Sequence, residues 1–162
     1  MPFRLFHELY PEIAEKETRT ITVLQDSDVG VPPGEYGFLE MFCNEPGCDC
    51  RRVFFMVMTP AIKGPAAIVA WGWEDRDFYR RWMKGPADDS DLDELTGPVL
   101  NFGSPETYLS EAILDLTRKV LLRDTAFVER VKRHYAMFRE KIERKSTTAG
   151  GRASRGSRRR RR

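Results

Sequence analysis

The segment FCNEPGCDCRR, residues 42–52, constrains the fold of this chain most, because it places all three cysteines within eight positions. At its centre, Glu45-Pro46-Gly47-Cys48 suits a type II turn, in which proline takes the second position and glycine supplies the positive φ of the third. The chain therefore reverses direction between Cys43 and Cys48. We expect a β-hairpin with the cysteines at its tip, where Cys48 and Cys50, two positions apart on one arm, face the same way.

Three converging thiolates repel one another unless a cation lies between them, and Zn2+ does this with four ligands at roughly 2.0–2.3 Å. An odd number of cysteines also disfavours a disulfide framework. Although the spacing C-x4-C-x-C differs from the common C-x2-C pairs, we predict that Cys43, Cys48 and Cys50 bind zinc. Two alternatives remain open: reactive thiols, with Cys50 or Cys48 as a nucleophile beside Arg51, and passive burial.

A closed zinc site needs a fourth ligand, and the chain has only two histidines, His7 and His134. His134 falls on an apolar helical stripe between Val131 and Phe138, where a histidine is more often a structural core residue than a ligand. His7 precedes the first expected strand, and we predict it as the fourth metal ligand. Glu45, or an open position that holds water, remains an alternative.

Four segments rich in β-branched and aromatic residues are predicted as strands: residues 18–24, 35–43, 51–59 and 66–73. A short helix over residues 11–17 begins at Pro11, and another covers residues 74–83. Ser104 with Pro105 is predicted to start a helix that carries Leu109, Ile113, Leu116 and Val120. Asp124 is predicted to cap the last helix, whose apolar stripe is Phe127, Val131, Phe138 and Ile142.

These elements define an α+β fold, in which an antiparallel β-meander of about four strands packs with C-terminal helices. The three tryptophans within residues 71–82 are interpreted as core residues, with stacking on nucleic-acid bases as the alternative. Residues 84–98 carry aspartates at alternate positions but lack the glycine and glutamate of a calcium loop, so we interpret them as a solvated acidic loop.

Charge divides the chain after Glu143. Residues 144–162 carry nine Lys or Arg and no acid, whereas the rest has 18 basic and 25 acidic residues, a net charge of −7. The tail has no large apolar residue with which to build a core. We predict one globular domain over residues 1–143 and a disordered Arg-rich tail over residues 144–162, which attracts nucleic acid through phosphate contacts or is a solvated extension without a partner.

Several function classes have no support in the sequence. There is no run of roughly 20 apolar residues for a membrane span, and the N-terminus lacks the apolar centre of an export signal, so we expect a cytoplasmic protein without a membrane partner. The sequence also lacks three common catalytic or nucleotide-binding motifs: G-x-S-x-G, G-x-x-x-x-G-K-[ST] and H-E-x-x-H. Their absence favours a noncatalytic protein.

The chain contains three distinctive blocks: FHELYPEIAEKETRTITV, PPGEYGFLEMFCNEPGCDCRRVFF and WGWEDRDFYRRWM. Through these blocks it resembles a family of uncharacterised bacterial proteins over roughly residues 3–142. The resemblance implies a small cytosolic protein and implies that the cysteine cluster and the segment around His7 belong together. It implies no activity. We therefore predict a noncatalytic zinc-binding protein with a macromolecular partner, either a protein or, through the basic tail, a nucleic acid.

Overall fold

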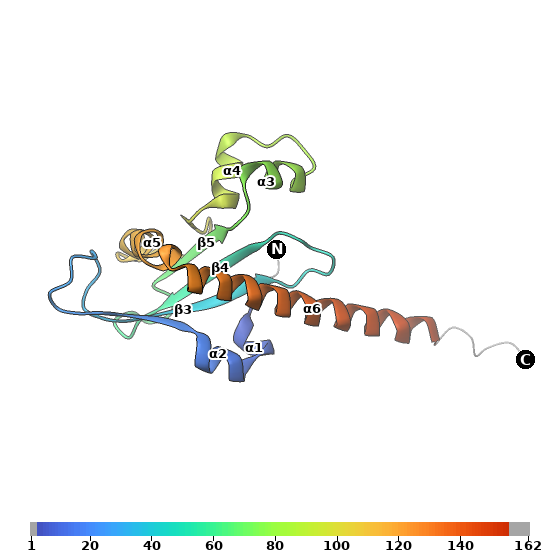
Figure 1. Ribbon diagram of the computed structural model, residues 1–162, viewed down its shortest axis with the longest axis horizontal. Helices are drawn as coiled ribbons and strands as arrows, with labels where there is room; N and C mark the ends of the chain where they lie inside the picture. Colours follow the sequence, from blue (N-terminus) through green and yellow to red (C-terminus); the bar gives the residue numbers. More distant parts are fainter. Residues whose placement is uncertain (1–2, 156–162) are drawn as a thin grey trace, which may run out of the picture.

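A six-stranded antiparallel sheet forms the centre of the molecule (Figure 1). The computed structural model describes the backbone of residues 3–155 and the side chains of residues 3–148. The strands are β1 (Phe3–Leu5), β2 (Arg19–Val23), β3 (Gly34–Cys43), β4 (Arg52–Met58), β5 (Ala67–Gly72) and β6 (Val99–Leu100). The four predicted strands correspond to β2–β5, which follow one another as an antiparallel meander. The α+β prediction is thus confirmed.

The long strand β3 organises the sheet. One of its edges pairs with β4, and the other is shared by two short strands. The first half pairs with β2, where Arg19 lies opposite Phe38, and the second half pairs with β1, where Phe3 lies opposite Cys43. Antiparallel pairing therefore brings the N-terminal segment to the end of β3 that carries the first cysteine.

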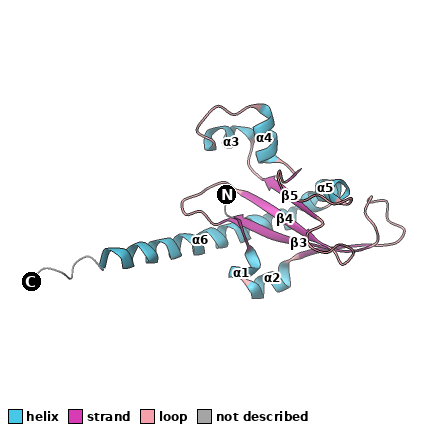
Figure 2. Ribbon diagram, turned by 180° about the vertical axis from the view of Figure 1, so that it is seen from behind, coloured by secondary structure: helices cyan, strands magenta, loops and turns pink. Residues whose placement is uncertain are grey.

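Helices cover one face of this sheet and extend beyond its edge (Figures 1 and 2). The helices are α1 (Phe6–Leu9), α2 (Pro11–Glu17), α3 (Arg76–Trp82), α4 (Asp89–Thr96), α5 (Ser110–Lys119), a 3-10 turn η1 (Leu121–Arg123) and α6 (Thr125–Arg155). The long helix α6 lies across the sheet together with α5. Helices α3 and α4 form a separate pair beside the end of β5, with their own small core of Tyr79, Leu92 and Leu95.

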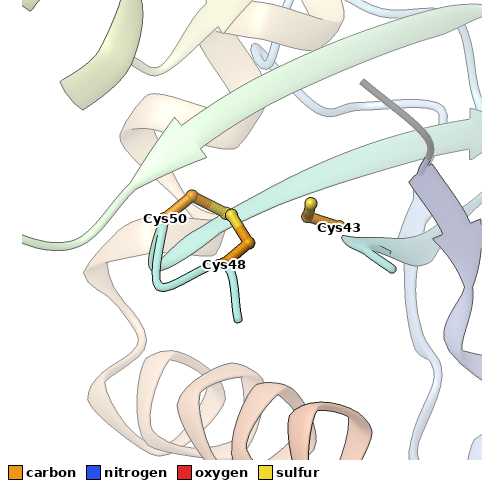
Figure 3. A group of neighbouring side chains, drawn as sticks. All are labelled: Cys43, Cys48 and Cys50. Atoms are coloured by element: carbon orange, nitrogen blue, oxygen red, sulfur yellow. The ribbon is translucent and has the colours of Figure 1, made fainter. Parts of the chain in front are cut away.

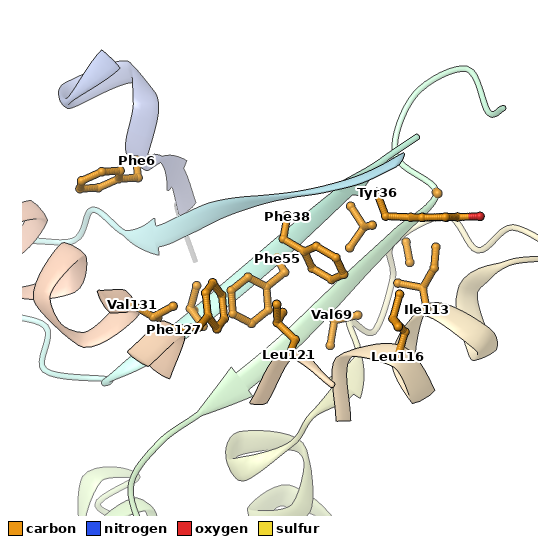
Figure 4. Packing of buried hydrophobic residues seen from close by; sticks show 14 of the residues in the cluster. Phe6, Tyr36, Phe38, Phe55, Val69, Ile113, Leu116, Leu121, Phe127 and Val131 are labelled. Carbon is orange, nitrogen blue, oxygen red and sulfur yellow. The ribbon is translucent and has the colours of Figure 1, made fainter. Parts of the chain in front are cut away.

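The main core lies between the sheet and α5 and α6. Alternate residues of β3 face it, because successive side chains of a strand point to opposite sides. Figure 4 shows Phe55 of β4 beside Phe127 of α6, and their ring centroids are 5.8 Å apart. The predicted stripe of α6 is confirmed: Phe127, Val131, Phe138 and Ile142 are all buried. Each such side chain contributes about 1.5–3 kcal/mol when it leaves water, so these helices hold the sheet.

Two expectations about helices are wrong. The helix predicted to start at Ser104 begins at Ser110, because Ser104 Oγ accepts a 2.6 Å hydrogen bond from Asn101 and the Ser110 hydroxyl is held by Ala66 O. The acidic segment is not a loop over its whole length but contains α4, whose N-terminus is closed by a capping box between Asp88 and Asp91. Such a box satisfies backbone N–H groups that are free at a helix start.

Helix α6 continues past the predicted domain boundary at Glu143 as far as Arg155. The first part of the tail predicted to be disordered is therefore helical, supported by an ion pair between Arg144 and Glu140 and by the Thr148 hydroxyl, which donates to Arg144 O. Residues 156–162 lie outside the described part of the chain. Among residues 3–155, no helix combines the length and the apolar composition that crossing a bilayer requires.

Candidate metal centre

The turn between β3 and β4 has the predicted geometry. Cys48 N donates a 3.2 Å hydrogen bond to Glu45 O, and Gly47 has a φ of 73°, as the third position of a type II turn requires. Cys43 is the last residue of β3. Because β4 begins only at Arg52, Cys48 and Cys50 lie in the connecting segment and not on a strand, which corrects that part of the prediction.

The three thiols nevertheless converge (Figure 3). Their sulfur atoms all lie within 4.8 Å of one another, and none forms a disulfide. Three sulfurs at roughly 2.3 Å from one tetrahedral metal are about 3.8 Å apart, so a small movement would suit the group to an ion. Cys43 and Cys50 are buried, whereas Cys48 is half-buried. The arrangement is a three-thiol group that could hold a metal ion.

Hydrogen bonds within the group separate the acidities of the thiols. The bond from Cys50 lowers the pKa of Cys43 to about 6, although burial opposes this. The same bond, together with burial, raises the pKa of Cys50 above its ordinary value, and burial raises that of Cys48. Of the three thiols, Cys43 is therefore the one whose thiolate its surroundings favour most.

Helix α6 holds the backbone of the cysteine turn. Arg139 donates from Nη1 to Cys43 O at 2.8 Å and from Nη2 to Glu45 O at 2.9 Å. Gly47 N donates to Glu143 Oε1 at 2.8 Å. Since these contacts satisfy backbone groups on both sides of the turn, the cysteines are positioned by a regular element and not by the loop alone.

Arg51 stands directly after the last cysteine in a left-handed conformation, with a φ of 48°. Its backbone N donates to the Tyr135 hydroxyl at 3.2 Å, and its carbonyl accepts from the Tyr79 hydroxyl at 2.9 Å. Its guanidinium pairs with Asp49 and Glu74, both at 2.9 Å. The Asp49 carboxylate is therefore engaged by Arg51 and is not among the converging ligand atoms.

The structure does not bring His134 to the cysteines. Its Nδ1 lies 2.7 Å from Glu40 Oε2, its Nε2 lies 2.6 Å from Glu17 Oε2, and its ring stacks on Phe6 with centroids 4.2 Å apart. Burial disfavours the imidazolium, but the bonds and charges of the two glutamates outweigh burial and raise the pKa of His134. Both ring nitrogens are thus occupied, and the interpretation of His134 as a satisfied core residue agrees with its contacts.

His7 lies in α1 and is not among the converging ligand atoms of the described residues. It borders a small cavity that Glu40 and His134 also line. Glu40 precedes Cys43 by three residues on β3, a separation of roughly 10 Å along a strand. The geometry therefore offers no support for His7 as the fourth ligand, and that assignment stays a prediction.

A cavity of about 440 Å³ adjoins the exposed side of the cysteine group. The turn residues from Glu45 to Asp49, including Cys48, line one side of it, and Trp82 and Lys84 at the end of α3 line the other. Cys48 is the cysteine that this cavity reaches. The other two tryptophans, Trp71 and Trp73, pack against the main core, as expected.

The sequence interpretation missed two sets of residues. Glu40 lies on the same side of β3 as Phe38 and Phe42, so its alternation with buried aromatics signals a buried charge. Tyr135, Arg139 and Glu143 recur every four residues on α6, the spacing of one helix face. That spacing was visible in the sequence, but nothing in it indicated that this face meets the cysteine turn.

Comparisons with models of protein families, with curated proteins and with solved structures gave no match for this chain.

Proposed function

We propose that the chain is a zinc-binding protein in which Cys43, Cys48 and Cys50 hold the metal in a noncatalytic role. The observation that carries this proposal is the convergence of three thiols from one turn, all within 4.8 Å of one another. Passive burial accounts poorly for it, because Cys48 is half-buried beside a cavity and gains little from packing.

The chemistry of the donors favours zinc among the common metals. Thiolates are soft ligands that select zinc, copper(I) or iron–sulfur clusters over magnesium and calcium, and an iron–sulfur cluster ordinarily takes four cysteines. A divalent ion with three thiolates carries a net charge of −1. Arg139, whose Nη1 lies 2.8 Å from the carbonyl oxygen of Cys43 and whose charge helps to lower the pKa of that thiol, lies where it offsets part of this charge.

The metal would fix the end of the hairpin. Cys43 ends β3 and the other two ligands lie in the connection that follows, whose backbone α6 already holds through Arg139 and Glu143. A bound ion adds a link between the end of β3 and the start of β4, so this end of the molecule becomes a fixed surface for a macromolecular partner. Noncatalytic function agrees with the position of His134, whose two nitrogens are engaged by glutamates and are not directed at the cysteines.

Metal analysis tests the proposal. The full chain, purified without added zinc, should contain one equivalent of zinc, and Cys43→Ser, Cys48→Ser and Cys50→Ser should each lower its content while keeping the fold. Lys63→Gln is the control, since it alters an exposed residue outside the cluster and should leave the zinc content unchanged. A wild-type protein that is free of metal and binds no added zinc would contradict the proposal.

A thiol-reactive protein is the second candidate, favoured by the low pKa of Cys43 and by the half-buried Cys48 beside the cavity. Thiolates are the reactive form of cysteine at neutral pH. In this case the purified protein lacks metal, and its thiols are alkylated rapidly at pH 7. Under the zinc proposal alkylation is slow until a chelator removes the metal, so one time course separates the two candidates.

A further inference from the structure

The three cysteines are unequally buried, so the group has an inner side within the protein and an outer side near solvent. Cys43 and Cys50 are 0% and 2% exposed and form the inner side, while Cys48 forms the outer side and lines the 440 Å³ cavity. Two of the three thiols are thus closed off by protein. Any ligand that reaches an ion held by the three sulfurs enters from the cavity.

The described chain supplies no fourth ligand of the expected type. Among residues 3–148, no His, Asp or Glu joins the three sulfurs within 4.8 Å. The nearest carboxylate along the chain, Asp49, is held by Arg51, and His134 is enclosed by its two glutamates. Zinc takes four ligands, and sites with three protein ligands keep the fourth position for water or another molecule.

We infer that the fourth position belongs to a thiolate from outside the chain, which enters through the cavity between the cysteine turn and the end of α3. This inference rests on the proposed zinc site. It follows from the donor set and from the cavity beside Cys48. A metal ion deprotonates a coordinating thiol outright, and zinc with soft ligands accepts another soft one.

A fourth thiolate makes the group more negative, and nearby cations offset that charge. Lys84 is the one cationic residue among those that line the cavity, and the carboxylates of Glu45 and Asp49 belong to the same lining, with Asp49 paired to Arg51. Arg139 lies on the other side of the turn, bonded to the carbonyl oxygens of Cys43 and Glu45. The preference for a thiolate therefore comes from the softness of its sulfur, and Lys84 can pair with a carboxylate that the ligand carries.

The far wall of the cavity fits the organic part of such a ligand. Trp82 presents an indole ring there, which offers apolar contact area. A volume of about 440 Å³ lies within the range of sites for small molecules, and it also admits one side chain of a peptide. A free thiol compound and a cysteine of a protein partner share the same coordinating atom, so the ligand class is the thiolate and its source is decided by experiment.

Cobalt(II) provides the test, because its sulfur-to-metal charge-transfer absorption reports the number of bound thiolates. The full-length protein is loaded with one equivalent of cobalt and titrated with 3-mercaptopropionate, or with a short peptide that contains one cysteine. Propionate and the matched serine peptide are the controls, and metal content is measured after each titration. We expect saturable growth of this absorption by about one third, as four thiolates replace three.

Variants locate the ligand. Lys84→Gln should weaken the binding of 3-mercaptopropionate several-fold without changing cobalt binding, whereas Lys63→Gln, a change at an exposed lysine elsewhere, should leave both unchanged. A response to the small thiol, the cysteine peptide or both supports the inference and identifies the source of the thiolate.

Three results overturn the inference. They are unchanged absorption with both thiols in the cobalt-loaded protein, a response to imidazole but not to thiols, and loss of metal from His7→Ala, which would show that the chain supplies its own fourth ligand. In each of them cobalt still binds to the wild-type cysteines, so the zinc site itself stands. If cobalt does not bind at all, the proposed function fails and not only this step.

Discussion

Arg139 donates a hydrogen bond of 2.8 Å from its Nη1 to the carbonyl oxygen of Cys43, and so ties the last helix to the first cysteine of the cluster. Its second nitrogen reaches Glu45 O within the same turn. The guanidinium thereby spans the corner at which the chain leaves β3. Because groups that position ligands affect metal affinity without touching the metal, this contact has a measurable consequence.

Replacing Arg139 by glutamine should lower zinc affinity by roughly ten-fold or more, since the turn loses its link to α6. Competition with a chromophoric chelator measures the change. Arg144→Gln is the matched control, because Arg144 lies on the same helix but forms an exposed pair with Glu140. Equal zinc affinities for the wild type and both variants would show that α6 does not position the cysteines.

The Glu17–His134–Glu40 cluster should matter for stability and not for metal binding. His134→Ala leaves Glu40, whose side chain is 4% exposed, without its cationic partner. Breaking such a buried pair costs about 3–5 kcal/mol, so urea unfolding should show a large loss of stability. His7→Ala, at the edge of the same region, should cost much less. A small effect of His134→Ala would contradict this structural role of the cluster.

The same cluster predicts how stability depends on pH. The hydrogen bond to His134 lowers the pKa of Glu17, so this stabilisation is present above the ordinary value of 4.5 and is lost as the pH falls through the lowered one. The pKa of His134 is raised, so its stabilisation is complete below 6.5 and is lost as the pH rises through the raised value. The free energy of unfolding should therefore have a plateau between pH 4.5 and 6.5, and it should decline at lower and at higher pH. In His134→Gln the alkaline decline should disappear, and its persistence would assign it to another group.

Gly72 is the point at which the α3–α4 pair meets the sheet. A Cβ at this position would lie 2.2 Å from the Tyr79 hydroxyl and 2.4 Å from Leu95 O, and the second of these is backbone. Gly72→Ala should therefore destabilise the protein by about 1–3 kcal/mol through overpacking. Gly37→Ala is the control, since its Cβ would meet only Met58 O at 3.9 Å. Similar thermal midpoints for the two variants would contradict the close approach.

The basic C-terminal segment predicts weak, salt-dependent binding of nucleic acid. Nine Lys or Arg without an acid in residues 144–162 would displace counterions from phosphates, so affinity should fall steeply as salt rises. Fluorescence anisotropy with labelled DNA and RNA compares the full chain with a chain that ends at Thr148. Undiminished affinity of the shorter chain would reject this function for the segment.

The sequence predicts the site well where its geometry is local. Pro46 and Gly47 define the turn through their own φ preferences, and Asp124 caps α6 with a 3.1 Å bond to Phe127 N. A fourth metal ligand from elsewhere in the chain is harder to predict from the sequence, because its identity depends on where distant segments lie in the fold. The pairing of β1 with β3, and the small cavity that His7 shares with Glu40, are tertiary features that residue spacing does not contain.

In the fold, too, the features that depend on local sequence could be predicted, and those that depend on tertiary contacts could not. The four long strands and the stripe of α6 are set by hydrophobic periodicity, which is a property of the segment itself. Strands β1 and β6, of three and two residues, exist only through pairing with β3 and β5. Likewise α5 begins late because the Ser110 hydroxyl bonds to Ala66 O, 44 residues away in the chain. Such tertiary contacts override local capping preferences.

The metal environment tests the central claim most directly. X-ray absorption at the zinc edge, recorded on the full chain loaded with one equivalent of zinc and without added thiol, counts the atoms bound to the metal. We predict three sulfur atoms at roughly 2.3 Å and one nitrogen or oxygen atom at roughly 2.0–2.2 Å. A first shell of nitrogen and oxygen atoms alone would contradict the assignment of Cys43, Cys48 and Cys50 as the metal site.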